Sequence, residues 1–178
     1  MGKNKRSVKN NKEPKNSVSN TQKVSSKLKV RIDFVANSNI WLKAVKVKDY
    51  TNFLKDEKQF SKYFYKVMNI LIPAVQQDWE KMLSDRDAFP HCHDIRSDAR
   101  KKVNSLLNTM YPNYDESMEV MQLGLNGSPR IIVSIIREDN ISVIRPLFID
   151  YHHLIYPDDW YNKEDVDKYT FCPYRSFN

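Results

Sequence analysis

Two neighbouring apolar runs in the C-terminal half limit most strongly what this chain can fold into. They read "RIIVSIIR" (130–137) and "ISVIRPLFID" (141–150), and only "EDN" separates them. Both are rich in β-branched residues, which favour strands, and so short a polar connection is typical of a hairpin. The apolar side chains of the second run fall on both faces of a strand. This pattern predicts a central or near-central strand that continues to Tyr156 and is covered on both sides.

Before the hairpin, the apolar period changes to that of helices. Asp56 and Gln59 resemble a capping box, and Pro73 either kinks this first helix or opens a second one. A third helix is expected to begin near Ser97 and to end before Pro112. The residues expected on the buried helical faces are Phe60, Phe64, Val67, Leu71, Val75, Trp79, Met82, Leu83, Val103, Leu106, Leu107 and Met110.

The order of the predicted elements indicates an α+β fold. Two N-terminal strands, "LKVRIDFV" (28–35) and "IWLKAVKV" (40–47), precede the helices, and the second could pair back on the first through the turn "ANSN" (36–39). Three or four strands follow the helices. We expect an antiparallel sheet with about three helices packed on one face. A chain of 178 residues can form one such domain, but not two large ones. The domain is expected at 27–178, with its helical part at about 49–111, its β part at about 118–157 and an aromatic C-terminal wrap at 158–178.

Basic residues are concentrated at the N-terminus. Residues 1–31 contain ten Lys or Arg and one acidic residue, whereas the rest of the chain contains nineteen Lys or Arg and twenty-one acidic residues. Residues 1–26 contain few apolar side chains, so we expect a disordered basic arm. Such an arm can bind nucleic acid, most simply RNA, or it can be a solubilising leader without a specific partner. The candidate nucleic-acid-binding residues are Lys3, Lys5, Arg6, Lys9 and Lys12.

Several classes of protein are disfavoured by the sequence. No apolar run approaches the ~18 residues that a membrane helix needs, and the N-terminus lacks the apolar core of a secretory signal. Cys92 and Cys172 lie eighty residues apart and do not form a disulfide framework. We therefore expect a cytoplasmic protein that does not enter a membrane. P-loop, Rossmann, GxSxG and paired-cysteine zinc motifs are missing, so no cofactor is expected.

The segment "LGLNGSPRIIVSIIREDNISVIRPLFIDYHHLIYP" (123–157) resembles the core of the RelE/YoeB/ParE-type toxins of bacterial toxin–antitoxin pairs. It also resembles a group of small prophage- and defence-associated proteins. The resemblance implies a ribonuclease that needs no metal. It implies that Arg130 binds a phosphate and that Tyr156 or His153 acts as general acid or base.

The two adjacent histidines of this segment have different expected roles. In a strand, alternation places Asp150 and His152 on one face and His153 on the other, so only one histidine can point into a given pocket. His153 is the functional candidate because it lies nearer to Tyr156 in the sequence. His152 is the structural candidate and is expected to be held by Asp150.

A metal site is the second hypothesis. His91 and His93, in "PHCHDI", could point the same way from an extended segment, and His152 or Cys172 could complete a tetrahedral set of ligands. The competing interpretation is a loop in which these histidines only bond to nearby backbone, so no metal is predicted.

The aromatic C-terminus supports a non-catalytic alternative. Trp160, Tyr161 and Tyr174 are residue types that dominate protein interfaces, although covering the core is the ordinary role of such rings. The predicted function is that of a small intracellular nucleic-acid-associated protein of toxin or defence type, a metal-independent ribonuclease in its most specific form. The alternative is an interaction module, a subunit of a larger complex, that docks a protein partner through this segment.

Overall fold

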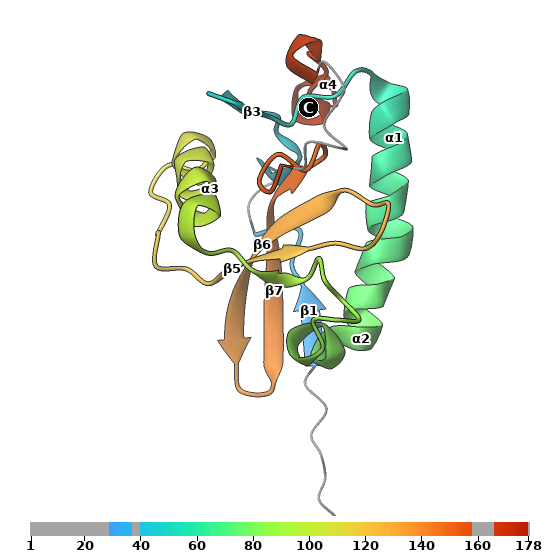
Figure 1. Cartoon of the computed structure of the whole chain (residues 1–178), viewed down its shortest axis with the longest axis vertical. Coiled ribbons are helices and arrows are strands. Elements are labelled where there is room, and N and C mark those ends of the chain that lie inside the picture. The colour runs from blue at the N-terminus through green and yellow to red at the C-terminus, as the bar shows by residue number, and fades with distance from the viewer. Residues whose placement is uncertain (1–28, 37–39, 158–165, 178) are drawn as a thin grey trace, which may run out of the picture.

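The computed structural model describes residues 29–36, 40–157 and 166–177 (Figure 1). Its strands are β1 (Lys29–Ile32), β2 (Lys46–Val47), β3 (Tyr50–Thr51), β4 (His93–Asp94), β5 (Val120–Leu123), β6 (Arg130–Glu138) and β7 (Ile141–Asp150). Its helices and helical turns are η1 (Ile40–Leu42), α1 (Glu57–Lys66), η2 (Val67–Leu71), α2 (Ile72–Ser84), α3 (Ser97–Met110), η3 (Val166–Lys168) and α4 (Pro173–Ser176). The predicted disordered arm, residues 1–26, lies outside the described residues.

A five-stranded sheet with the order β1-β7-β6-β5-β4 forms the centre of the fold. The sheet is mixed and not wholly antiparallel as expected, because β1 and β7 are parallel. The predicted hairpin is confirmed, because β6 and β7 pair antiparallel from Arg130 opposite Asp150 to Glu138 opposite Ile141. The predicted pairing of the two N-terminal strands is wrong. β1 instead pairs parallel with β7, and β2 pairs with β3 in a separate small sheet. The partner of β1 is thus a strand far along the chain, and not the next strand in the sequence.

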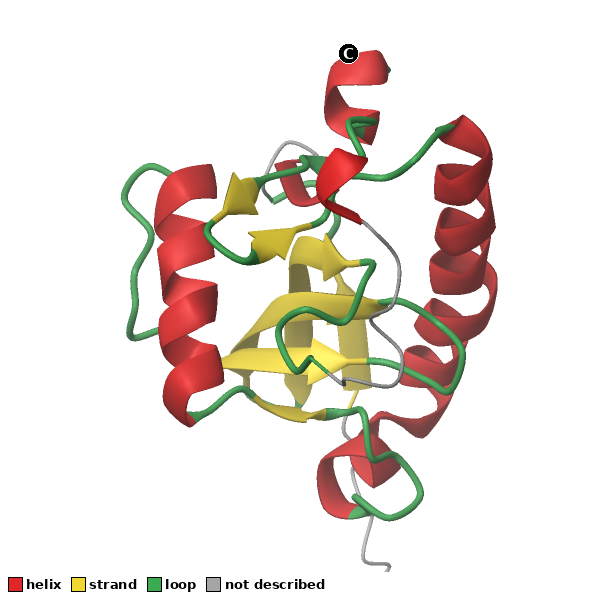
Figure 2. Cartoon of the chain, turned by 45° about the horizontal axis from the view of Figure 1, so that its top comes forward, coloured by secondary structure: helices red, strands yellow, loops and turns green. Residues whose placement is uncertain are grey.

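The α+β class is confirmed, but helices cover both faces of the sheet and not one (Figure 2). Leu71 and Trp79, from the α1–η2–α2 side, share a core with Ile131 of β6. Leu107 of α3 packs on the opposite face, in a second core that contains Ile132. The reason is that β6 carries apolar side chains at consecutive positions, so both of its faces must be covered.

The helix boundaries agree with the local signals. Asp56 is the N-cap of α1, and its Oδ1 accepts from the backbone N of Gln59 at 2.8 Å. The helix does not stop before Pro73: it passes through the π-helical turn η2 into α2, where proline occupies the first turn. α3 buries the four residues predicted for it, Val103, Leu106, Leu107 and Met110.

The strand β7 differs from the prediction in two places. A register shift pairs Ile132 with Phe148 but Val133 with Pro146, so Leu147 has no opposite residue. Proline is tolerated at such a bulge because it cannot donate to the ladder. Leu147 and Phe148 consequently pack in one core instead of on opposite faces. β7 also ends at Asp150, before the two histidines, whereas the strand was expected to reach Tyr156.

Among the helices of the described ranges, none has the length and the apolar composition that crossing a membrane requires.

Candidate active site

A pocket of about 670 Å³ brings together residues from three separate parts of the chain. His91, His93, Arg130, His153 and Tyr156 all line it. The three predicted catalytic residues, His153, Tyr156 and Arg130, therefore share one site. Three of the four histidines of the chain meet there, so the two histidine clusters of the sequence are adjacent in space.

A tight turn after β7 orients His153. The carboxylate of Asp150 accepts from the backbone N of Leu154 at 3.0 Å and from that of Ile155 at 2.9 Å. His153 lies inside this turn with a φ of 58°, in the left-handed region that residues with a Cβ rarely adopt. The two hydrogen bonds offset the cost of that conformation. Because the strand has already ended, the orientation of His153 follows from the turn and not from strand alternation.

His152 points away from the pocket, and its predicted partner is wrong. Its Nε2 donates to the backbone O of Phe53 at 2.7 Å, whereas Asp150 is occupied by the turn. The ring also contacts Tyr151 and Tyr169. His152 is thus a buried residue that ties the turn to the segment before α1, which agrees with the structural role predicted for it.

We expect His152→Ala to lower the free energy of unfolding by about 1–2 kcal/mol, because the Phe53 carbonyl loses its donor. Urea unfolding of the variant beside wild type measures this. His152→Gln is the matched control, since its amide can still donate, and it should recover most of the loss. Equal losses in both variants would show that the hydrogen bond is not what His152 contributes.

Arg130 forms a fixed cation in the wall of the pocket. It is 7% exposed, and its Nη1 donates to the backbone O of Leu125 and of Ser128, both at 2.8 Å. Gly124 makes room for it, because a Cβ at position 124 would lie 2.4 Å from Cδ of Arg130. Burial lowers the pKa of Arg130 and the charge of Asp150 opposes this, but a guanidinium stays protonated in proteins.

His91 and His93 are held by hydrogen bonds that select their tautomers. Nδ1 of His93 donates to the backbone O of Asp94 at 3.1 Å, so its Nε2 is left to accept from the amide of Gln122 at 3.3 Å. Nε2 of His91 faces Oδ1 of Asn126 at 3.0 Å. That oxygen can only accept, so the proton of a neutral His91 ring is on Nε2 and its Nδ1 carries a lone pair. The ring of Tyr156 stands edge-on to His93, with 5.1 Å between the ring centroids.

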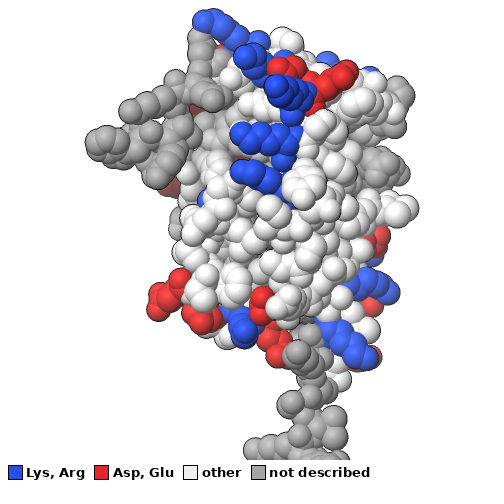
Figure 3. Space-filling view, turned by 90° about the vertical axis from the view of Figure 1, so that its right-hand side faces the viewer, with Lys and Arg blue, Asp and Glu red and all other residues white. Residues whose placement is uncertain are grey.

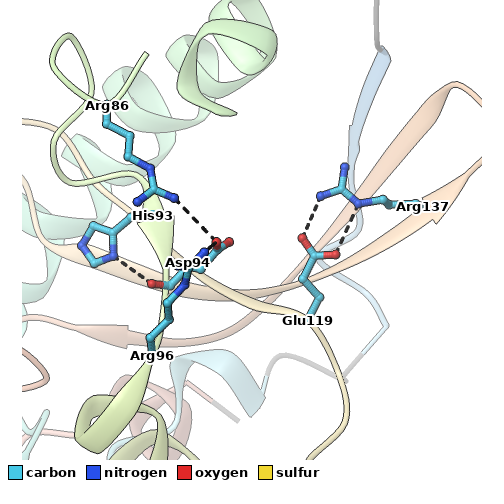
Figure 4. Close-up of polar contacts among 6 residues, drawn as sticks. All are labelled: Arg86, His93, Asp94, Arg96, Glu119 and Arg137. Carbon is cyan, nitrogen blue, oxygen red and sulfur yellow. Dashed lines mark hydrogen bonds and ion pairs between the residues drawn. The ribbon is translucent and has the colours of Figure 1, made fainter. Parts of the chain in front are cut away.

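Ion pairs involving Asp94 and Glu119 lie near His93 (Figure 4). The carboxylate of Asp94 contacts Arg96 at 2.7 Å and Arg86 at 3.8 Å, and Glu119 contacts Arg137 at 2.8 Å. These side chains are 37–69% exposed, so each pair adds little to stability. Their effect is local: Asp94 links β4 to Arg86 and Arg96 in the flanking segments, and the Glu119–Arg137 pair links the start of β5 to β6.

The pocket environment lowers the pKa of two of its histidines, His153 and His91. Burial, together with the charge of Arg130 and the neighbouring His91 and His152, lowers the pKa of His153 to about 4. Burial and Arg130 also lower the pKa of His91, while Asn126 opposes the shift. Burial raises the pKa of the Tyr156 hydroxyl. Near neutral pH the pocket therefore contains a proton acceptor, a phenol that retains its proton and a permanent cation.

The predicted metal ligands do not form one set. His91 and His93 line the pocket, but His152 bonds to Phe53, and Sγ of Cys172 accepts from the backbone N of Ala44 at 3.3 Å. Within the ranges that the structure describes, no three His, Cys, Asp or Glu side chains lie close enough to hold a metal ion.

Of the remaining predicted site residues, only Tyr174 belongs to the described part of the chain, and it does not line the pocket. Trp160 and Tyr161 fall outside the described residues, as do the arm residues Lys3, Lys5, Arg6, Lys9 and Lys12. Tyr174 is half-buried in α4. The described part of the C-terminal segment, residues 166–177, contacts the rest of the domain, because Phe171 and Leu54 exchange two backbone hydrogen bonds of 2.9 Å. Docking of a partner through this segment stays a prediction.

Sequence reasoning did not place Gln122, Asn126 and Gly124 in the site. Gln122 and Asn126 orient the two histidines of β4 and its preceding loop, and Gly124 accommodates Arg130. All three lie in or just after β5, whose register places Gln122 opposite His93. The one sequence signal for the site is the grouping of all four histidines in two clusters. No local pattern indicates that β5 lies between these two clusters in the structure.

The site residues lie within the part of the chain that is similar to known proteins. A family model described as "Uncharacterised protein UU032" matches residues 37–178. A curated protein described as "Uncharacterized protein UU032", from Ureaplasma parvum serovar 3 (strain ATCC 700970), is 37% identical over 177 residues. The alignment covers 96% of this chain and 95% of that relative. No solved structure matches the chain. The chain belongs to the UU032 family.

Proposed function

We propose that this protein is a small nucleic-acid-associated protein of toxin or defence type that cleaves single-stranded RNA without a metal ion. The observation that carries the proposal is the convergence of His153, Tyr156 and Arg130, with His91 and His93, in one pocket. Such a pocket offers a base, an acid and a cation to one phosphate group. The proposed reaction rests on this geometry, whereas the toxin or defence type rests on the resemblance of residues 123–157, which stays a prediction.

The proposed reaction uses each group in the protonation state that its surroundings favour. Neutral His153 removes the proton of a ribose 2′-hydroxyl, and the 2′-oxygen attacks the adjacent phosphorus. Arg130 stabilises the negative charge that develops on the phosphorane. The bond to the 5′-oxygen breaks, and Tyr156 protonates the leaving oxygen. The products are a 2′,3′-cyclic phosphate and a 5′-hydroxyl end.

The remaining parts of the proposal concern location and partners. We place the protein in the cytoplasm, because Cys92 and Cys172 are unpaired thiols and reduced thiols are usual there. Lys3, Lys5, Arg6, Lys9 and Lys12 would strengthen RNA binding through charge alone. A protein partner, as for other toxin-type proteins, would use the C-terminal segment that includes Tyr174.

The substrate's 2′-hydroxyl provides the test of the reaction. Purified protein with EDTA is expected to cleave a labelled single-stranded RNA and to leave a cyclic phosphate. An RNA of the same sequence with a 2′-deoxy nucleotide at the cleaved position should bind equally well and stay intact, because the attacking oxygen is missing. Cleavage of the deoxy substrate would contradict the mechanism, and intact RNA with both substrates would contradict the proposed activity.

The pH dependence of kcat/KM should reflect the free protein. We expect a plateau from about pH 6 to about pH 9, because neutral His153 and protonated Tyr156 are both in the required form there. The rate should fall on the acid side only as the pH approaches the His153 pKa of about 4, where the base becomes protonated. Initial rates in buffers of constant ionic strength measure the profile. An acid limb centred near the ordinary histidine pKa of about 6.5 would argue against His153 as the base.

A further inference from the structure

We propose that the lysine row of α1, Lys58, Lys62 and Lys66, binds the phosphate backbone of the same RNA strand that enters the active-site pocket. We call this pocket, which His91, His93 and His153 line, the histidine pocket. This inference rests on the proposed function and adds a second contact surface to it. It differs from binding through the N-terminal arm, since the row belongs to the folded domain.

The three lysines lie on one face of the helix. They follow one another at intervals of four residues, which places them in a single line about 6 Å apart along the axis. Lys58 and Lys62 are exposed, and Lys66 is half-buried. Figure 3 views the molecule from the side of α1 and shows basic side chains in succession down the upper half of this face, with acidic ones only beside the uppermost.

Within the described residues, no ion pair neutralises the row. Residues 58–77 contain no Asp or Glu, so no acidic residue follows the lysines for more than three helical turns. None of the ion pairs in the described part of the chain involves Lys58, Lys62 or Lys66. Like charges four residues apart destabilise a helix, and an anionic chain lying along the row would remove that repulsion.

The row leads directly to the histidine pocket. Lys62 and Lys66 line a second pocket of about 300 Å³, which also contains Gly127 and His153. Gly127 and His153 line the histidine pocket as well, so the two cavities adjoin at these residues. Nζ of Lys66 donates to the backbone O of Gly127, which ties α1 to this shared wall. An RNA strand whose scissile phosphate lies beside His153 can thus continue through the second pocket onto the lysines.

The chemistry of the row fits a nucleic-acid backbone. Lysine ammonium groups act as point charges that contact phosphates without reading bases. A single strand is flexible enough to turn from a pocket onto a helix, and its affinity then depends on salt through the number of phosphates contacted. The row should therefore contribute affinity for long RNA and nothing for a fragment that fills only the histidine pocket.

RNAs of two lengths distinguish binding to the lysine row from binding to the histidine pocket. The full chain and its Lys58→Gln/Lys62→Gln variant are titrated with a labelled dinucleotide and with a labelled single strand of about ten nucleotides, both carrying a 2′-deoxy nucleotide to prevent cleavage. At physiological salt we expect the variant to bind the long strand roughly tenfold more weakly and the slope of log K against log salt to fall by about 1.4. Dinucleotide binding should be unchanged. Lys66 is left in place because it bonds to Gly127.

A second double variant, which removes the same charge elsewhere on the protein, is the control for the lysine row. Lys81→Gln/Lys101→Gln removes the same charge from α2 and α3, where both lysines form ion pairs with a neighbour on the same helix. Equal weakening by the two double variants, weakening of the dinucleotide, or no change with either RNA would overturn the inference. The inference would also be overturned if a labelled polyglutamate peptide bound through Lys58 and Lys62 while the long RNA did not bind. Wild-type protein that binds neither RNA would instead overturn the proposed function, and the lysine row with it.

Discussion

His153→Asn is expected to slow RNA cleavage by roughly 10² to 10⁴-fold, the range over which a positioned general base accelerates proton transfer. Asparagine tolerates the left-handed conformation that position 153 adopts, so the turn after β7 should persist. The amide cannot accept the 2′-hydroxyl proton as an imidazole does. RNA affinity should change little, because Arg130 remains in place.

Single-turnover cleavage rates of wild type and variant at pH 7 measure this effect, and circular dichroism checks that the fold is kept. His152→Gln is the control, because His152 lies next in sequence but does not line the histidine pocket. We expect it to cleave at the wild-type rate. If His153→Asn cleaved as fast as His152→Gln, His153 would have no role in the chemistry, and the proposed reaction would lose its base.

Asp150→Asn is expected to lower the free energy of unfolding by about 3 kcal/mol. The side chain is fully buried, both of its oxygens accept backbone N–H groups, and its charge lies opposite Arg130 in the sheet. An amide can accept from only one of the two donors and leaves the buried guanidinium without its counter-charge. Burial raises the pKa of Asp150, but the two N–H donors oppose this and favour the ionised form.

Asp33→Asn provides a matched comparison. Asp33 also accepts from two backbone N–H groups, those of Val35 and Ala36, and it lies 3.4 Å from an arginine, Arg145. Its side chain is 28% exposed, so water can compensate for the lost charge, and we expect a loss below about 1 kcal/mol. Chemical denaturation of both variants tests the difference. Losses of similar size would show that the burial of Asp150 opposite Arg130 does not determine how much Asp150 contributes to the free energy of unfolding.

Local signals were sufficient for the elements whose form depends on near neighbours. The α3 boundaries followed from its apolar spacing and Pro112, and the cap at Asp56 followed from the residue types there. The β6–β7 hairpin followed from two β-branched runs and a short connection. Each of these features is determined by interactions within a few residues, which is the range over which a sequence pattern carries information.

The site was only partly predictable. Arg130, His153 and Tyr156 were named through a resemblance, and the structure brings them into one pocket. His91 and His93 were assigned instead to a metal hypothesis, because nothing in "PHCHDI" shows that β4 pairs with β5 beside the turn after β7. The role of Asp150 was also missed: alternation assumes that the strand continues, whereas the carboxylate ends it by capping the turn.

The sequence by itself determined the α+β class, the hairpin, the helix ends and the apolar faces, since propensity, capping and periodicity act locally. Only the tertiary structure decided that β1 lies parallel to β7, that helices cover both faces of the sheet, and that three histidines meet Arg130. These features depend on pairings between residues tens of positions apart. Such pairings are stabilised because two surfaces that lie far apart in the sequence are buried against each other. The residue pattern of one segment does not indicate which other segment it packs against.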